Sequence, residues 1–116
     1  MPLLTKRIYE PDDVGDGHRL LVMRYWPRGV RKERVDEWQR ALAPTKELLA
    51  DLNSGAIEWG EYVERFRAEM ASRPGSAEAI DELRRRSASE TVTVLCWCKD
   101  ENRCHRGLLR ELVEAA

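Results

Sequence analysis

The sequence lacks any long run of apolar residues. Charged side chains make up 35% of its 116 residues, and the opening segment MPLLTKRIYE contains no extended apolar stretch. A helix that spans a bilayer needs about 20 mostly apolar residues, and a secretory signal needs an apolar segment of about 7–15 residues. We therefore expect a cytoplasmic protein with no membrane partner.

Cysteine is also scarce. The chain has three cysteines, an odd number that does not suit a framework of disulfides. In a protein without an export signal, such cysteines are expected to be reduced thiols that remain available for chemistry. The hydrophobic content of 42% is that of a globular protein, and 116 residues are enough for one core of ordinary size.

Neither sign of charge dominates. The 20 lysines and arginines are balanced by 21 aspartates and glutamates, whereas proteins that bind duplex DNA normally have a marked basic excess. We therefore expect no duplex DNA partner. The balance hides a segregation, because residues 19–40 carry seven basic against three acidic side chains and residues 47–82 carry nine acidic against three basic ones. The basic stretch is either an anion-binding surface or a solvated face.

Three strands are predicted. Residues 3–10 and 19–26 are separated by the turn-forming sequence PDDVGDG, which indicates two short strands joined by a loop. Residues 91–98, TVTVLCWC, are rich in β-branched and apolar side chains without polar alternation. This pattern is typical of a central strand that is covered on both faces.

Five helices are predicted, four of them between the second and third strands. The helical spacing of Val35, Trp38 and Leu42 predicts a helix that ends near Pro44, and residues 44–53 predict a short one that begins with Pro44 and Thr45. The other three are predicted over residues 59–70, from Ser76 as the N-cap through Leu83, and over residues 102–113. The stripe in the third helix is predicted to be core; it consists of Trp59, Tyr62, Val63, Phe66 and Met70.

The order strand, strand, several helices, strand, helix is typical of an α/β protein. The long helical crossover before the third strand favours a parallel pairing of that strand. We therefore predict a single α/β domain over residues 1–116, with a small sheet of about three main strands, at least partly parallel, flanked by about five helices.

A binding crevice is predicted beyond the carboxyl ends of the strands, where helix N-termini also gather in open α/β sheets. The segments RYWPRG and RCHR follow the second and third strands and would meet there. Their arginines could converge with the positive end of the last helix on one small anion. The predicted anion-binding and substrate-binding residues are Arg24, Trp26, Arg28, Arg103 and Arg106.

Cys104 lies in the first turn of the predicted last helix, where the helix dipole and neighbouring cations can lower the pKa of a thiol. This position favours Cys104 as a nucleophile, with His105, on the inward side of the helix, as the acid or base. The alternative is structural: the three cysteines are small buried hydrophobes and His105 is a satisfied core residue.

The same segment offers four candidate ligands for a structural zinc ion: Cys96, Cys98, Cys104 and His105. Two features argue against this interpretation. Cys96 and Cys98 fall in or at the end of the predicted strand, and adjacent residues on a helix, such as Cys104 and His105, diverge by about 100°. We therefore expect no metal ion and no other cofactor.

The chain also resembles a known family. The blocks WPRG, LAPTKEL and CHR, in this order and at these separations, are similar to the bacterial domain-of-unknown-function 488 family, in its short YeaO-like branch. The resemblance covers nearly the whole chain and implies a small α/β domain in which CHR opens the last helix. It places the motif cysteine at Cys96, the CHR block at Cys104, His105 and Arg106, and the arginines of the RYWPRG block at Arg24 and Arg28.

Two positions depart from the pattern of that family. Many relatives have glutamate where this chain has Cys98, and the short branch usually has aspartate where it has Met23. These departures argue against a mechanism that depends on a fixed carboxylate at either position.

Two functional hypotheses remain open. The first is an enzyme that acts on a phosphate- or nucleotide-like small molecule in the arginine-rich crevice, with the Cys-His-Arg motif at the helix N-terminus. The second is a non-catalytic binding or regulatory module in which the same arginines hold a nucleotide or single-stranded nucleic acid and Trp26 stacks on a base.

Overall fold

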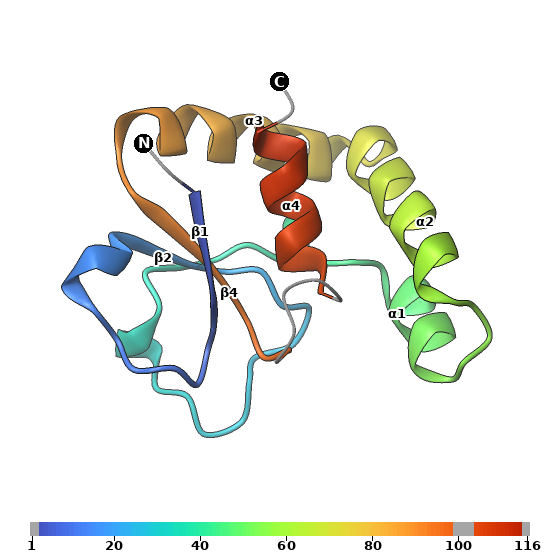
Figure 1. Ribbon diagram of the computed structural model, residues 1–116, viewed down its shortest axis with the longest axis horizontal. Coiled ribbons are helices and arrows are strands. Elements are labelled where there is room, and N and C mark those ends of the chain that lie inside the picture. Colours follow the sequence, from blue (N-terminus) through green and yellow to red (C-terminus); the bar gives the residue numbers. More distant parts are fainter. Residues whose placement is uncertain (1–2, 99–103, 115–116) are drawn as a thin grey trace.

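A parallel four-stranded sheet forms the centre of the computed structural model, which describes residues 3–98 and 104–114 (Figure 1). The strands are β1 (Leu3–Arg7), β2 (His18–Leu21), β3 (Glu37–Trp38) and β4 (Val92–Cys96), in the spatial order β1-β4-β2-β3. All three pairings are parallel. The predicted α/β class and the three predicted strands are confirmed, and β3 is an additional edge strand.

β4 is the central strand because it pairs with β1 on one side and β2 on the other. All five of its residues are buried. Alternate side chains face opposite sides of the sheet, so Val92, Val94 and Cys96 point to one face while Thr93 and Leu95 point to the other. Burial on both faces explains the absence of polar alternation in this segment.

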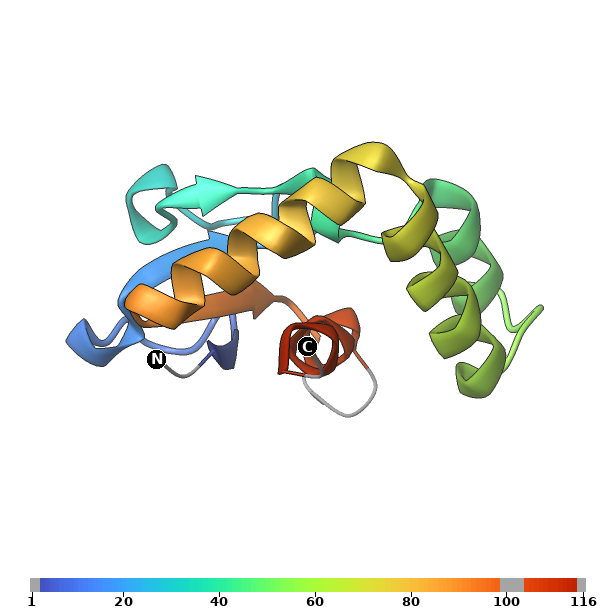
Figure 2. The same ribbon diagram turned by 90° about the horizontal axis from the view of Figure 1, so that it is seen from above.

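The described residues form four α-helices: α1 (Lys46–Asn53), α2 (Trp59–Ser72), α3 (Pro74–Ser89) and α4 (His105–Glu114). α1, α2 and α4 lie on one side of the sheet, to the right in Figure 1. Figure 2, which looks along α4, shows this helix between the sheet and α2. Tyr62, Phe66 and Met70 of α2 are buried in the main core, as predicted, and the Thr45 hydroxyl caps α1 by accepting from the Leu48 N–H.

The helix predicted from Val35, Trp38 and Leu42 is wrong. The chain is extended at β3 and then forms a single 3-10 turn over Arg40–Leu42. Val35 and Trp38 pack on the outer face of the sheet with Leu21, whereas Leu42 is buried in the main core on the helix-covered face. One helix could not place these side chains on opposite faces of the sheet.

Ser76 was predicted as an N-cap, and this is also wrong. α3 begins two residues earlier with Pro74 at its first position, where the missing N–H of proline costs no hydrogen bond. Ser76 lies inside the helix, and its hydroxyl donates to the Ala41 carbonyl at 2.6 Å. The residue therefore ties α3 to the segment before α1.

The outer face of the sheet, covered by loops rather than helices, carries a buried polar network. The Asp16 carboxylate accepts from Lys6 at 3.1 Å and forms an ion pair with Arg19, and the Thr93 hydroxyl donates to the Asp16 carbonyl at 2.7 Å. The neighbouring Gly17 has φ +63°, and a Cβ there would lie 2.2 Å from the Thr91 carbonyl oxygen. Only glycine fits this close approach.

Across the described residues, no helix is long and apolar enough to cross a membrane. The carboxyl ends of β1 and β4 point the same way, toward the bottom of Figure 1, and the first turn of α4 lies near the end of β4. This edge of the sheet brings together the segments that the sequence analysis singled out.

Candidate functional site

Three sulfur atoms and one imidazole nitrogen meet where β4 ends and α4 begins. The Cys96 and Cys98 sulfurs are 3.7 Å apart, and the Cys104 sulfur is 3.9 Å from Nδ1 of His105. The Cys96 and Cys104 sulfurs and one ring nitrogen of His105 all lie within 4.8 Å of one another. These four residues are termed the thiol cluster below.

Each member of the cluster is positioned by a different part of the fold. Cys96 ends β4 on the helix-covered face of the sheet and is buried. Cys98 lies beyond the end of the strand and is half-buried. Cys104 comes directly before α4, and His105 is the first residue of that helix. Because Cys104 is outside the helix, the two side chains do not follow helical spacing and can face the same point.

His105 is buried, with its ring 5.9 Å from the ring of Phe66, and points inward as predicted. Its Nε2 lies 2.5 Å from the Val22 carbonyl oxygen. A carbonyl can only accept, so Nε2 carries the proton and Nδ1 presents a lone pair to the thiols. Burial lowers the pKa of His105, more than the hydrogen bond to Val22 raises it, and the ring is neutral at pH 7.

The thiols differ in acidity. Hydrogen bonds from Cys104 and Cys96, together with the positive charge of Arg106, lower the pKa of Cys98. Hydrogen bonds of Cys96 with Cys104 and Cys98, together with burial, raise the pKa of Cys96. The hydrogen bond with Cys96 lowers the pKa of Cys104, but the contact with Cys98 and burial outweigh it, and the net shift is upward. Of the three thiols, Cys98 therefore loses its proton most readily.

Arg106 is 4% exposed and lies beside the cluster. Its Nη1 donates to the Cys98 carbonyl at 2.5 Å, and its Nε has no hydrogen-bond partner among residues 3–98 and 104–114. Among the described residues, no carboxylate lies within ion-pair distance of its guanidinium group. A buried cation without a carboxylate needs another negative partner, and the thiol cluster is in reach.

The thiol cluster lies at the floor of a pocket of about 220 Å³, termed the thiol pocket. Its walls are mainly aromatic and aliphatic, from the ends of β2 and β4 and from α1 and α2. The aromatic residues are Tyr25, Trp59, Tyr62 and Trp97, and the aliphatic ones are Met23, Pro44, Leu49 and Leu52. Arg24 also lines the pocket, and among the described residues its guanidinium makes no ion pair or hydrogen bond.

The structure brings together only some of the residues predicted for the site. Arg24, Cys104 and His105 line the thiol pocket, and Arg106 lies behind it. Arg103 falls outside the described residues.

Trp26 and Arg28 lie apart from that pocket. Trp26 packs on the outer face of the sheet, edge-on to Trp38 at 5.3 Å between ring centroids, and its Nε1 donates to the Val30 carbonyl. Arg28 is exposed, and its carbonyl accepts from Tyr9.

Sequence reasoning missed two groups that line the pocket. Trp59 and Tyr62 belong to the helical stripe that was correctly predicted to be core, but their rings also form a wall of the thiol pocket. Trp59 is only partly buried at the first turn of α2, and the spacing of a stripe contains no signal for this second role. Cys98 was attributed to strand packing, although it lies beyond the strand end.

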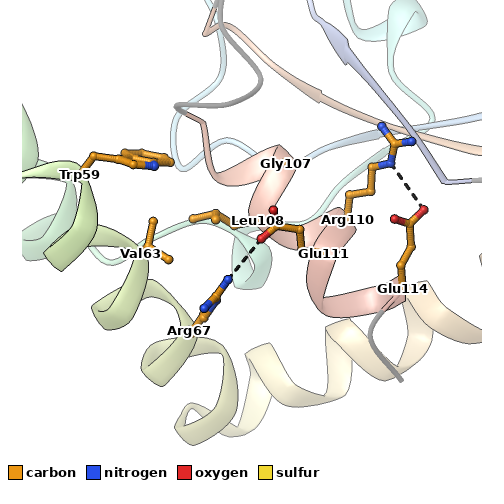
Figure 3. Close-up of a pocket in the computed structure, with 8 residues that line it drawn as sticks. All are labelled: Trp59, Val63, Arg67, Gly107, Leu108, Arg110, Glu111 and Glu114. Atoms are coloured by element: carbon orange, nitrogen blue, oxygen red, sulfur yellow. Dashed lines mark hydrogen bonds and ion pairs between the residues drawn. The ribbon is translucent and has the colours of Figure 1, made fainter.

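A second pocket, of about 460 Å³, lies between α2 and α4 (Figure 3). Figure 3 shows its charged side chains facing one another: Arg67 pairs with Glu111 at 3.2 Å, and Arg110 pairs with Glu114 at 3.5 Å. Since these charges offset each other and no thiol or histidine lines this pocket, we place the candidate site at the thiol pocket.

Comparison with known proteins identifies relatives over almost the whole chain. Residues 3–116 match the DUF488-N3a model, described as the active DUF488-N3 subclade. The uncharacterized protein YeaO of Escherichia coli K12 is 27% identical over 113 residues, which cover 96% of each chain. The uncharacterized protein Rv3073c of Mycobacterium tuberculosis H37Rv is 33% identical over 109 residues, covering 92% of this chain and 89% of the relative.

No solved structure matches the chain. The family match covers nearly every residue, including the β4 to α4 segment that carries the thiol cluster. The resemblance seen in the sequence is therefore confirmed, and the chain belongs to the DUF488 family, in its DUF488-N3a subclade.

Proposed function

We propose that this protein is an enzyme that acts on a small molecule bound in the thiol pocket. One observation carries the proposal: all three cysteines and His105 line a single pocket whose other lining residues are mainly apolar. A concave apolar site with a few convergent polar groups and shifted pKa values is the usual form of an active site. The word "active" in the description of the family is consistent with this proposal.

The walls favour a flat ring with a negatively charged substituent. Trp59, Tyr62 and Trp97 supply ring faces and edges, and Arg24 supplies a positive charge. The volume of about 220 Å³ lies below the range of about 300–1,000 Å³ for whole drug-sized ligands. We therefore infer that one ring enters the pocket while a phosphate or similar anion stays near Arg24, as in a nucleotide-like molecule.

The nucleophile in this proposal is the Cys98 thiolate. It is the half-exposed sulfur of the cluster, and its pKa is lowered by hydrogen bonds from Cys104 and Cys96. Its electron pair forms the bond to an electrophilic atom of the substrate, and the leaving group departs with the electron pair of the bond that breaks.

Cys104, which the sequence suggested as the nucleophile, becomes the proton donor in this proposal, and His105 is its partner. The Cys104 thiol can give its proton to the leaving group, and Nδ1 of His105, 3.9 Å from that sulfur, orients the thiol. Arg106 completes the arrangement by placing a positive charge next to the thiolate. Arg28 and Trp26 lie outside this pocket and have no part in the proposed step.

Alkylation of the thiols tests the proposal. Reduced protein is treated with iodoacetamide at several pH values between about 5.5 and 8.5, and the modified cysteine is located by peptide mass mapping. We expect Cys98 to be modified rapidly even at the lowest of these pH values. Cys98→Ser should abolish the rapid phase, whereas His18→Gln, at a side chain that bonds to Glu37 away from the cluster, should retain it. A nucleoside monophosphate that occupies the pocket should slow the reaction.

Two results would contradict the proposal. If all three thiols react only as ordinary cysteines do, at pH values near 8.5 or above, the thiolate nucleophile is wrong. If nucleoside monophosphates bind, as followed by tryptophan fluorescence, but Cys98 is not reactive, the chain is a binding module and not an enzyme of this kind.

A further inference from the structure

We propose that the thiol cluster binds one zinc ion through the sulfurs of Cys96, Cys98 and Cys104 and Nδ1 of His105. The metal site itself follows from the geometry of the four side chains. Only its suggested role, to supply the reactive thiolate, rests on the proposed function.

The distances within the cluster are close to the edges of a zinc tetrahedron. With Zn–S bonds of about 2.3 Å and a Zn–N bond of about 2.0–2.1 Å, tetrahedral coordination places two sulfurs about 3.8 Å apart and a sulfur and a nitrogen about 3.6 Å apart. The Cys96 and Cys98 sulfurs are 3.7 Å apart, and the Cys104 sulfur is 3.9 Å from Nδ1 of His105. The metal-binding atoms of Cys96, Cys104 and His105 lie within 4.8 Å of one another and must contract by up to about 1 Å. The half-buried Cys98, which is outside this group, must turn its sulfur from Cys96 toward the same point.

His105 is held as a zinc ligand would be. A metal-bound histidine almost always donates its second ring N–H to a carboxylate or a backbone carbonyl, which fixes the tautomer and the ring orientation. Nε2 of His105 lies 2.5 Å from the Val22 carbonyl oxygen, so Nδ1 is the nitrogen that is left with a lone pair. That lone pair points toward the thiols and needs no proton loss to coordinate a metal.

The local charge balance is compatible with the zinc site. Zinc with three thiolates and a neutral imidazole carries a net charge of −1. Arg106 is buried beside the cluster, its Nη1 donates to the Cys98 carbonyl, and its Nε has no hydrogen-bond partner. Without a metal, the Cys98 thiolate supplies the counter-charge of this cation among the described residues. With the metal, the zinc and its thiolates supply the same net charge of −1.

The objection from sequence does not hold in the structure. Adjacent helical residues diverge, but Cys104 precedes the helix and only His105 belongs to it. Cys96 and Cys98, two residues apart at the end of β4, bring their sulfurs to the same side. Zinc binds thiolate sulfur and imidazole nitrogen in a tetrahedral arrangement, whereas magnesium and calcium bind oxygen ligands.

With zinc bound, the Cys104 sulfur and Nδ1 of His105 are ligands, so the activation of Cys98 by the metal takes the place of proton transfer through this pair. Coordination deprotonates a thiol outright, so the protons of Cys96 and Cys104 are released to solvent when the ion binds. Cys96 and Cys104 are buried, whereas Cys98 is half-exposed and lines the thiol pocket. Cys98 is thus the coordinated sulfur that a substrate in the pocket can reach.

Cobalt is a suitable probe because the visible absorption of bound Co²⁺ depends on its coordination geometry. Reduced full-length protein, stripped of metal with a chelator, is titrated with Co²⁺ and followed by visible and near-ultraviolet absorption. We expect intense tetrahedral bands and thiolate charge-transfer bands that saturate at one Co²⁺ per chain and disappear when Zn²⁺ is added. Weak octahedral bands, or no saturation, would overturn the zinc site.

Variants identify the ligands. Cys104→Ser and His105→Asn should weaken Co²⁺ binding at least about 100-fold, since each removes a ligand. The matched control is His18→Gln, because His18 bonds to Glu37 at 3.0 Å on β3, away from the cluster. Circular dichroism of each metal-free variant checks that it folds. Unchanged Co²⁺ affinity in folded Cys104→Ser would also overturn the proposal.

The zinc site and the proposed function can fail separately. If Co²⁺ does not bind tetrahedrally but Cys98 is alkylated rapidly, the zinc site is wrong and the thiolate enzyme stands. If Co²⁺ binds as expected but Cys98 is inert to iodoacetamide both with and without zinc, the site is structural, the metal proposal stands and the proposed function fails.

Discussion

Buried charges are arranged differently on the two faces of the central sheet. On the outer face, the Asp16 carboxylate pairs with Lys6 at 3.1 Å and with Arg19, and Arg19 also pairs with Asp12 at 3.2 Å. On the helix-covered face, Arg106 is equally buried but has no carboxylate partner among the described residues, and its neighbours are three thiols and a neutral histidine.

The difference separates a structural network from a functional site. Charges taken out of water must be paired, and a fold that pairs them internally gains rigidity and has nothing left to offer a ligand. A buried cation whose counter-charge depends on ionised thiols is incomplete unless a metal or an anion supplies it. Such local conflicts are most often found where a protein performs its function.

The largest effect on stability is expected from a substitution in the ion-pair network on the outer face of the sheet. Asp16→Ala removes the carboxylate and leaves Lys6 and the buried Arg19 without their main partner. Loss of one member of a buried pair typically costs about 3–5 kcal/mol. We expect the free energy of unfolding, measured by urea denaturation at pH 7, to fall by this amount.

Glu82→Ala is the matched control for this change. It also removes a carboxylate from an arginine pair, with Arg85 at 2.8 Å, but both side chains are more than half exposed. Exposed pairs contribute little, so the unfolding free energy should not change measurably. Equal destabilisation by the two variants would contradict the role assigned to the buried network.

A smaller effect is expected from pH. Burial alone raises the pKa of Asp16, but the hydrogen bond and charge of Lys6, with the charge of Arg19, outweigh it and lower the pKa below 3.8. The unfolded chain therefore binds a proton more readily than the folded one. The stability that Asp16 contributes is complete above pH 3.8 and is lost as the pH falls through the lower pKa of the folded state.

The pH effect is measured by urea denaturation between neutral and acidic pH. One group changes the unfolding free energy by at most about 1.4 kcal/mol per pH unit. Asp16→Asn should be less stable at neutral pH and should lose this part of the acid dependence. If the slope below pH 3.8 is the same in the variant and the natural chain, the lowered pKa of Asp16 is wrong.

The sequence predicts the fold well where the apolar pattern of a segment has a single structural explanation. β4 is apolar at every position because it is covered on both faces, and the stripe of α2 is buried by a single core. It fails at residues 35–42, where side chains at helical spacing are buried on opposite faces of the sheet. Spacing within a segment does not reveal that two different cores receive its side chains.

Part of the candidate site can be predicted from the topology of the parallel sheet. The parallel sheet places the residues after β2 and β4 at one edge, so Arg24 and the CHR motif were expected to meet. Trp26 belongs to the same loop as Arg24 but packs on the outer face beside Trp38, which no local pattern indicates. The approach of Cys98 to Cys96 depends on how the chain leaves the strand, which also requires the structure.

The smallest effect on stability is expected from the unpaired face. Arg106→Met keeps the apolar stem and removes a buried cation that has no carboxylate partner among the described residues, at the cost of one hydrogen bond to the Cys98 carbonyl. Because the desolvation penalty of the charge offsets that hydrogen bond, the unfolding free energy of the metal-free protein should change by less than about 1 kcal/mol. Affinity for Co²⁺ should nevertheless fall about tenfold or more, since the counter-charge of the thiolates is lost. A loss of stability as large as that of Asp16→Ala would mean that Arg106 is a structural charge like Arg19, and the contrast between the two faces would disappear.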